Sequence, residues 1–260
     1  IHEVGHLLVS RKRKIETFFP TVLPAPILPN LGVRTMLKTS PKDRTSLFDF
    51  AFAGPLFGIL ASVVLLAVGV FLTGGAGPEE LKLFPTVPVG TIQLSTLGGS
   101  IIDLANGGLG SVTSLVPTDV IPLHPYAIAG FFSLFIQSLE MLPLGSTDGG
   151  RICQALVGRT KAFIIGVITY AALLLGTFLP HSGNLLAGAW VIFNLFQADQ
   201  EVPCREELDG VDILRSILGV VLMLVAFSAI FPMDPFYDMS AALDTPLGPP
   251  IDLATSSIVP

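Results

Sequence analysis

Charged side chains are scarce in this chain of 260 residues, in which Asp, Glu, Lys and Arg together make up 13%. An ordinary soluble domain carries about a quarter of such residues. Hydrophobic residues account for 51%, and the mean hydropathy is +0.73. The composition excludes a typical soluble domain and predicts an integral membrane protein in contact with the lipid bilayer. It also speaks against nucleic acid as a partner, because too few basic residues are present to neutralise a phosphate backbone.

Cysteine is rare as well. Cys153 and Cys204 are the two in the chain, and they stand too far apart in the sequence for a CxxC metal site or a disulfide framework. We interpret both as buried thiols without a chemical role.

The chain begins at Ile1 rather than at a methionine. Only about ten residues precede the basic cluster RKRK, fewer than the roughly twenty that a membrane-spanning helix needs. We therefore expect the first span to be truncated. No signal or transit peptide can be recognised in what remains.

Several hydrophobic runs are long enough to cross a bilayer, and together they predict an all-α polytopic membrane protein with about six transmembrane helices, the first of them truncated. A short helix near Arg151 follows a stretch broken by Gly and Pro. Besides the N-terminal helix, the expected spans cover residues 47–72, 126–143, 162–179, 184–196 and 213–231. The run 184–196 is short and could re-enter the membrane instead of crossing it.

The connecting segments differ in charge. Residues 11–45 hold eight of the fourteen Lys and Arg residues and predict a loop with a small extended or strand region, Arg34–Lys38. That region is interpreted either as an edge strand for an unwound substrate or as a plain hairpin. The segment 73–125 carries one basic residue and predicts a loop on the opposite side. By the positive-inside rule, the basic segments face the cytosol, or the stroma or matrix of an organelle.

The most informative motif lies at the start of the chain, where IHEVGH places His2 and His6 four residues apart with Glu3 between them. On a helix the two imidazoles share one face and can bind one Zn²⁺, while Glu3 is a candidate general base. The alternative is a pair of helix-face histidines whose partners are ordinary neighbours.

A catalytic zinc site needs a third protein ligand, and Asp148 is the candidate. It follows a hydrophobic span and is flanked by glycines that allow close approach of the backbone. An ionisable residue at membrane depth predicts a functional site. By itself a DGG turn is also typical of a helix cap.

These two motifs, HEVGH and EMLPLGSTDGG, resemble those of the site-2 proteases, which are intramembrane zinc metalloproteases. The runs GVRTMLKTSPKDRTSLFDFAFAGP, HPYAIAG and LPLGSTDGGR are similar to the plant and cyanobacterial branch, whose plant members are named for ethylene-dependent gravitropism and a yellow-green phenotype. The resemblance implies Zn²⁺ bound by His2, His6 and Asp148, with Glu3 activating the water. It further implies transmembrane protein substrates, and a chloroplast (plastid) membrane or a cyanobacterial-type membrane.

The sequence departs from the family at Glu140, where the second motif has Asn. The resemblance implies that Glu140, Pro143 and Gly149 contact substrate. Because Glu stands at position 140 in place of the family's Asn, the role of this residue in substrate binding is in doubt. Two other functions stay open: a catalytically inactive scaffold of the same family, and a transporter whose ionisable residues line broken helices. We assign residues 1–232 to the metalloprotease domain and 233–260 to a poorly ordered tail. The oligomeric state cannot be read from the sequence.

Overall fold

The computed structural model describes residues 1–22, 33–176, 178 and 201–233. The expected span 184–196 and nearly all of the C-terminal tail lie outside these residues. So does His181, which we interpret from the sequence, together with His124, as a histidine of the membrane interface. The described chain is mostly helical, as predicted, with only short strands. It divides into two compact units, one formed by Ile1–Ile59 and Ile136–Phe227, the other by Leu60–Phe135 and the described residues after Phe227.

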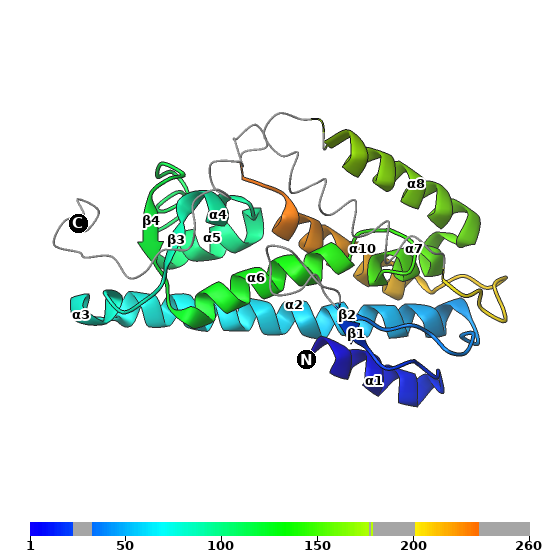
Figure 1. The fold of residues 1–260 in the computed structure, drawn as a ribbon. Helices are drawn as coiled ribbons and strands as arrows, with labels where there is room; N and C mark the ends of the chain where they lie inside the picture. Colours follow the sequence, from blue (N-terminus) through cyan, green and yellow to red (C-terminus); the bar gives the residue numbers. More distant parts are fainter. Residues whose placement is uncertain (23–32, 177, 179–200, 234–260) are drawn as a thin grey trace. The chain divides into compact units, whose positions relative to one another are not determined.

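The first unit is built from helices (Figure 1). They are α1 (His2–Arg13), the first half of α2 (Arg44–Gly75), the end of α6 (Pro125–Glu140), α7 (Asp148–Val157), α8 (Arg159–Gly176) and most of α10 (Ile213–Ile230). The expected boundaries of the spans agree with those of α2 and α10 within a few residues. The expected loop from residue 11 was wrong at both ends. Helix α1 extends to Arg13, because three basic side chains in its last turn favour the negative end of the helix dipole.

Close backbone approach brings the helices of this unit together. A Cβ at Gly5 of α1 would overlap the carbonyl of Ala53 in α2, so the two helices touch at that point. Figure 1 shows α1 alongside α2. A Cβ at Gly219 of α10 would lie 2.8 Å from Phe48 and 3.3 Å from Ile152. Helix α10 therefore packs on α2 and α7 at a glycine, where a larger side chain would require the ring of Phe48 to shift.

The extended region between α1 and α2 forms an antiparallel hairpin. Strand β1 (Thr21–Val22) pairs with β2 (Val33–Arg34), and a further bridge joins Thr17 to Leu37. The predicted strand region is thus present, although its regular ladder ends at Arg34. Because residues 33–38 pair with 16–22, one of their two edges is already used by the chain itself.

The second unit contains the expected loop 73–125, which is more structured than predicted. It holds α3 (Pro78–Leu81), β3 (Thr86–Pro88), α4 (Val89–Gln93), α5 (Thr96–Ala105) and β4 (Val120–Pro122), with β3 and β4 antiparallel. Asp103 at the end of α5 organises the glycine-rich turn that follows. Its carboxylate accepts hydrogen bonds from the backbone of Gly110, Val112 and Thr113 and from the Thr113 hydroxyl. Contacts between residues seven to ten positions apart leave no periodic signal in the sequence.

Two described helices, α2 and α10, are long and apolar enough to cross a membrane. In the most apolar stretch of α10 only 22% of residues are buried. An apolar helix surface of that extent is stable in contact with lipid rather than water.

We predict that Asp103→Asn lowers the free energy of unfolding by about 1–3 kcal/mol at pH 7, because the amide cannot accept all four hydrogen bonds. Burial raises the pKa of Asp103, but these hydrogen bonds outweigh it and hold the pKa below its ordinary value. The stabilisation is therefore present above about pH 4 and is lost as the pH falls through the folded-state pKa. Thermal unfolding in detergent between pH 3 and 7 should show the wild type and variant converging at low pH. Asp119→Asn, at a half-buried carboxylate that accepts one backbone hydrogen bond, is the control and should follow the wild type.

Candidate metal centre

Helix α1 places both histidines of the first motif on its buried face. His2 and His6 are four residues apart, so their side chains stand one turn above each other. Space for the His6 ring comes from Gly54 on α2, where a Cβ would overlap the imidazole. A Cβ at Gly58, one turn further along α2, would overlap the amide of Gln137. The small residues of α2 therefore do more than allow helix packing, because they make room for polar side chains of the site.

Helix α7 begins at Asp148, three residues before the predicted start. The Thr147 hydroxyl caps it, accepting a hydrogen bond of 2.9 Å from the Gly150 N–H. The preceding turn is held by Gly145, whose φ of 44° suits glycine. A Cβ at Gly149 would overlap the carbonyl of Met141. The two glycines after Asp148 thus let the broken segment fold back against α7.

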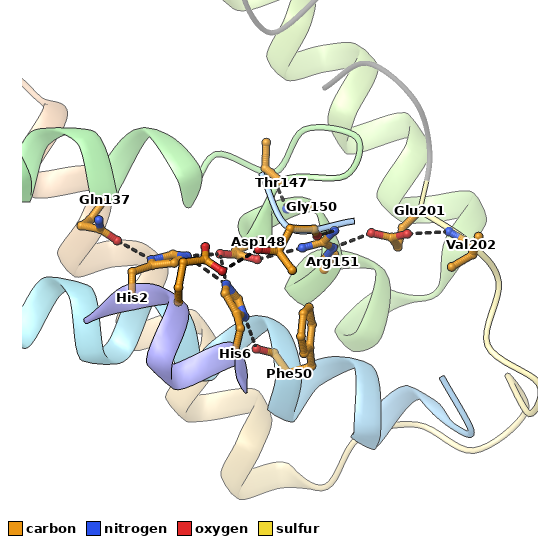
Figure 2. Close-up of polar contacts among 12 residues, drawn as sticks. His2, His6, Phe50, Gln137, Thr147, Asp148, Gly150, Arg151, Glu201 and Val202 are labelled. Carbon is orange, nitrogen blue, oxygen red and sulfur yellow. Dashed lines mark hydrogen bonds and ion pairs between the residues drawn. The ribbon is translucent and has the colours of Figure 1, made fainter. Parts of the chain in front are cut away.

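The structure brings His2, His6 and Asp148 together (Figure 2). The two Nε2 atoms lie 2.9 Å apart, and each lies 3.1 Å from Oδ2 of Asp148. Ligand atoms around a tetrahedral zinc, at bond lengths of 2.0–2.1 Å, are separated by about 3.3 Å. The three atoms are therefore arranged as a compact set of nitrogen and oxygen ligands for a small divalent cation.

The outer nitrogens of both imidazoles contact oxygen acceptors. Nδ1 of His2 lies 2.5 Å from Oε1 of Gln137, and Nδ1 of His6 lies 2.9 Å from the carbonyl oxygen of Phe50. These oxygens only accept hydrogen bonds, so in the neutral imidazole Nδ1 carries the proton and Nε2 presents its lone pair. Such contacts commonly orient metal-binding histidines. Three lone pairs thus converge on one point, where a cation would relieve their repulsion.

Arg151 is the main site residue that the sequence did not reveal. Its exposed fraction is 2%, and its guanidinium contacts three oxygens: Oδ1 of Asp148 at 3.2 Å, Oε2 of Glu201 at 2.5 Å and the carbonyl of Thr35 at 2.6 Å. The contact to Oδ1 leaves Oδ2 directed toward the histidines. Two buried carboxylates share one guanidinium, so the cluster retains an uncompensated negative charge that a cation would balance.

Some of these residues left a signal in the sequence. Gln137 is a polar side chain inside an apolar helix, and Arg151 is a charge one helical turn after Asp148, so both could have been identified. Thr35 and Glu201 lie far from the motifs along the chain, and no local pattern marks them. Long-range contacts of this kind only appear in the folded chain.

Glu3 lies on the same helix as the histidines. One carboxylate oxygen, Oε2, accepts a hydrogen bond of 2.6 Å from the Thr35 hydroxyl. The other, Oε1, is buried and has no hydrogen-bond partner among the described residues. The carboxylate is close enough to His2 for a direct electrostatic interaction.

The three residues expected to contact substrate occupy different environments. Glu140 is buried and close enough to His2 to interact with it electrostatically. Pro143 is partly exposed and lines a cavity together with Gln154 and residues of α8. Gly149 is buried against the Met141 carbonyl, which accounts for glycine there without a substrate. A role in substrate binding stays a prediction for all three.

Among the described residues, the candidate metal ligands do not include His124, Cys153 or Cys204. His124 belongs to the second unit, where its ring contacts Phe84 and Tyr126. Cys153 and Cys204 are buried and not bonded to each other. Burial raises the pKa of Cys204 to about 11, so this thiol stays protonated at neutral pH.

We predict that Gly54→Ala weakens Zn²⁺ binding at least tenfold, because the new methyl group displaces the imidazole of His6. Isothermal titration with Zn²⁺ measures the effect. Gly74→Ala is a matched control in the same helix, since nothing lies within 4 Å of a Cβ at that position. An unchanged zinc affinity in Gly54→Ala would contradict the placement of His6 in the centre.

The profile of peptidase family M50 matches residues 1–179. The chain is 30% identical over 240 residues to "Probable zinc metalloprotease EGY1, chloroplastic" of Oryza sativa subsp. japonica. The aligned residues cover 89% of this chain and 38% of that protein. The chain is 31% identical over 229 residues to the Arabidopsis thaliana protein of the same name, covering 87% and 40%.

A third relative is "Probable zinc metallopeptidase EGY3, chloroplastic" of Arabidopsis thaliana, 31% identical over 210 residues, with coverage of 78% of this chain and 35% of the relative. The chain thus spans about two fifths of the length of these relatives, between 35% and 40%. No solved structure matches it.

Proposed function

The chain belongs to peptidase family M50, and from that membership we propose that it is an intramembrane zinc metalloprotease, which hydrolyses peptide bonds of membrane-spanning proteins. The observation that carries the proposal is the convergence of His2, His6 and Asp148 beside Glu3. The names of the plant relatives support both the zinc and the proteolysis. A transporter is disfavoured because the three acidic residues that would form an ion path, Glu3, Glu140 and Asp148, all lie near His2 in the part of the chain that the structure describes. An inactive scaffold is disfavoured because the first motif is intact.

His2, His6 and Asp148 would hold the zinc through two Nε2 atoms and Oδ2. When bound, zinc supplies a Lewis acid that favours ionisation of water and polarises the peptide carbonyl. Gln137 and Phe50 keep both imidazoles in the tautomer that leaves Nε2 available. Arg151 holds the far oxygen of Asp148, so that the near oxygen faces the histidines.

Glu3 performs the proton transfers in this proposal. Its carboxylate accepts a proton from the water that attacks the peptide carbonyl carbon, and later delivers that proton to the amine nitrogen as the C–N bond breaks. The glutamate is regenerated unchanged. Its position on α1, directly after His2, keeps it next to the metal ligands throughout.

The wider architecture belongs to the same proposal. We propose about six transmembrane helices, with residues 1–232 as the metalloprotease domain, and α2 and α10 as two of the spans. The chloroplast names of the relatives support a plastid membrane. Glu140, Pro143 and Gly149 are proposed to contact the unwound substrate, with Glu140 in place of the family's Asn.

We predict that Glu3→Gln retains one equivalent of zinc but stops cleaving, with a loss of at least about 100-fold, because the amide cannot accept the proton. His2→Ala, His6→Ala and Asp148→Ala should each lose the metal as well as the activity. Metal analysis by mass spectrometry and cleavage of a detergent-solubilised membrane substrate measure both effects. Stoichiometric zinc in His6→Ala would refute the assignment of the ligands.

A second prediction concerns membrane topology. In a background with Cys153 and Cys204 replaced by Ala, single cysteines at Lys12 and Lys161 should label from the same face of sealed vesicles. A cysteine at Glu79 should label from the opposite face, because the segment that contains it is almost free of basic residues. Labelling of positions 12 and 161 from opposite faces would contradict the proposed arrangement of spans.

A further inference from the structure

Thr35 connects the helix of Glu3 with the helix of Asp148. It lies in the extended segment between β2 and α2 and is buried, with 4% of its surface exposed. Its hydroxyl donates a hydrogen bond of 2.6 Å to Oε2 of Glu3 on α1. Its backbone carbonyl accepts a hydrogen bond of 2.6 Å from Arg151 on α7.

The hydroxyl makes the two oxygens of Glu3 unequal. A distance of 2.6 Å is typical of a charge-assisted O–H···O⁻ bond, which is stronger than a bond between neutral groups. Oε2 is thereby anchored. Oε1 is buried, and among the residues that the structure describes no polar group bonds to it. Of the two oxygens, Oε1 is the one whose lone pairs are not used by a hydrogen bond within the described residues.

The backbone of Thr35 is held as firmly as its side chain. The guanidinium that donates to its carbonyl also contacts Asp148 and is itself paired with Glu201 in a buried ion pair. A carbonyl fixed in this way cannot shift without breaking a network of charge-assisted hydrogen bonds. The position of the Thr35 hydroxyl is therefore tied to the position of the carboxylate of Asp148.

We propose that Thr35 is a positioning residue for the reaction, which fixes Glu3 through Oε2 so that Oε1 takes the proton. The inference rests on the proposed proteolysis and assigns the step to one atom. The O–H bond of the attacking water breaks, and its proton is bound to Oε1. That proton then passes to the amine nitrogen as the C–N bond breaks. Thr35 keeps its own proton throughout and contacts neither substrate nor metal.

Two substitutions at one position test the role of the hydroxyl. Thr35→Val removes it while keeping the shape of the side chain, and Thr35→Ser keeps it. We expect Thr35→Val to lower kcat about 10- to 100-fold, less than the roughly 10²- to 10⁴-fold that general base catalysis contributes, because Glu3 itself remains. KM and zinc content should be unchanged. Thr35→Ser should restore kcat to within about threefold of the wild type, since the bond to Glu3 can re-form.

Thr39→Val is the matched control. Thr39 is half-buried, and its hydroxyl accepts a hydrogen bond of 3.0 Å from the backbone N–H of Glu16 in the same extended region. It should leave kcat unchanged. If the wild type cleaves and Thr35→Val cleaves equally fast, the inference is overturned while the proposed function stands. If the wild type binds zinc but cleaves no membrane substrate, the proposed function fails instead, and the catalytic role of Thr35 with it.

A double-mutant cycle tests the contact without any reference to activity. Melting temperatures are measured in detergent for the metal-free wild type, Thr35→Val, Glu3→Ala and the double variant. Each single substitution breaks the same hydrogen bond, so the double variant should lose less in Tm than the two single losses combined. Additive losses would show that the hydroxyl does not engage Glu3 and would overturn the inference.

Discussion

The first unit must hold three lone pairs within about 3 Å of one another, although they repel each other. Two imidazole nitrogens and one carboxylate oxygen meet at distances of 2.9 and 3.1 Å, and all three side chains are buried. Such a group is unfavourable unless a cation shares the space. The surrounding contacts are those needed to hold it. Gln137 and Phe50 direct the lone pairs of the imidazoles inward, and Arg151 turns the carboxylate.

Electrostatic charge accounts for the contacts that Arg151 makes in the same centre. Arg151 is shared by Asp148 and Glu201, so the buried cluster is negative before Glu3 is counted. A single guanidinium satisfies hydrogen bonds without neutralising the site. This balance suits a divalent cation better than a neutral ligand. The pairing with two carboxylates also explains why Arg151 can be buried, since an unpaired guanidinium in the protein interior would be strongly destabilising.

Glycine sets how closely the helices approach. Gly5 allows α1 to contact α2, and Gly54 leaves room for the ring of His6. The glycines after Asp148 let the segment before α7 fold back on its first turn. If side chains replaced these glycines, the helices could not approach so closely, and the histidines of α1 would lie farther from the aspartate of α7. The proposed proteolysis thus depends on positions that carry no chemistry themselves.

The sequence by itself determined the class of protein and the extent of two apolar helices, α2 and α10, and it predicted the residues that would bind metal. Low charge predicts a membrane protein, helical spacing puts His2 and His6 on one face, and a lone aspartate at the end of an apolar run marks Asp148. These signals are local, since they depend on the period of a helix and the cost of a charge in lipid. The start of α7 was missed by three residues because the Thr147 cap is a feature of one hydrogen bond.

Only the tertiary structure decided which groups hold these residues in place. Thr35 is joined to Glu3 and to Arg151 across separations of 32 and 116 residues, and Glu201 meets Arg151 across 50. The small folded region within 73–125, expected as a loop, depends on Asp103 in the same way. Hydrogen bonds between distant segments leave no periodic pattern in a single chain. They exist because folding brings donors and acceptors together in a buried place, where an unpaired polar group would cost too much free energy to be retained.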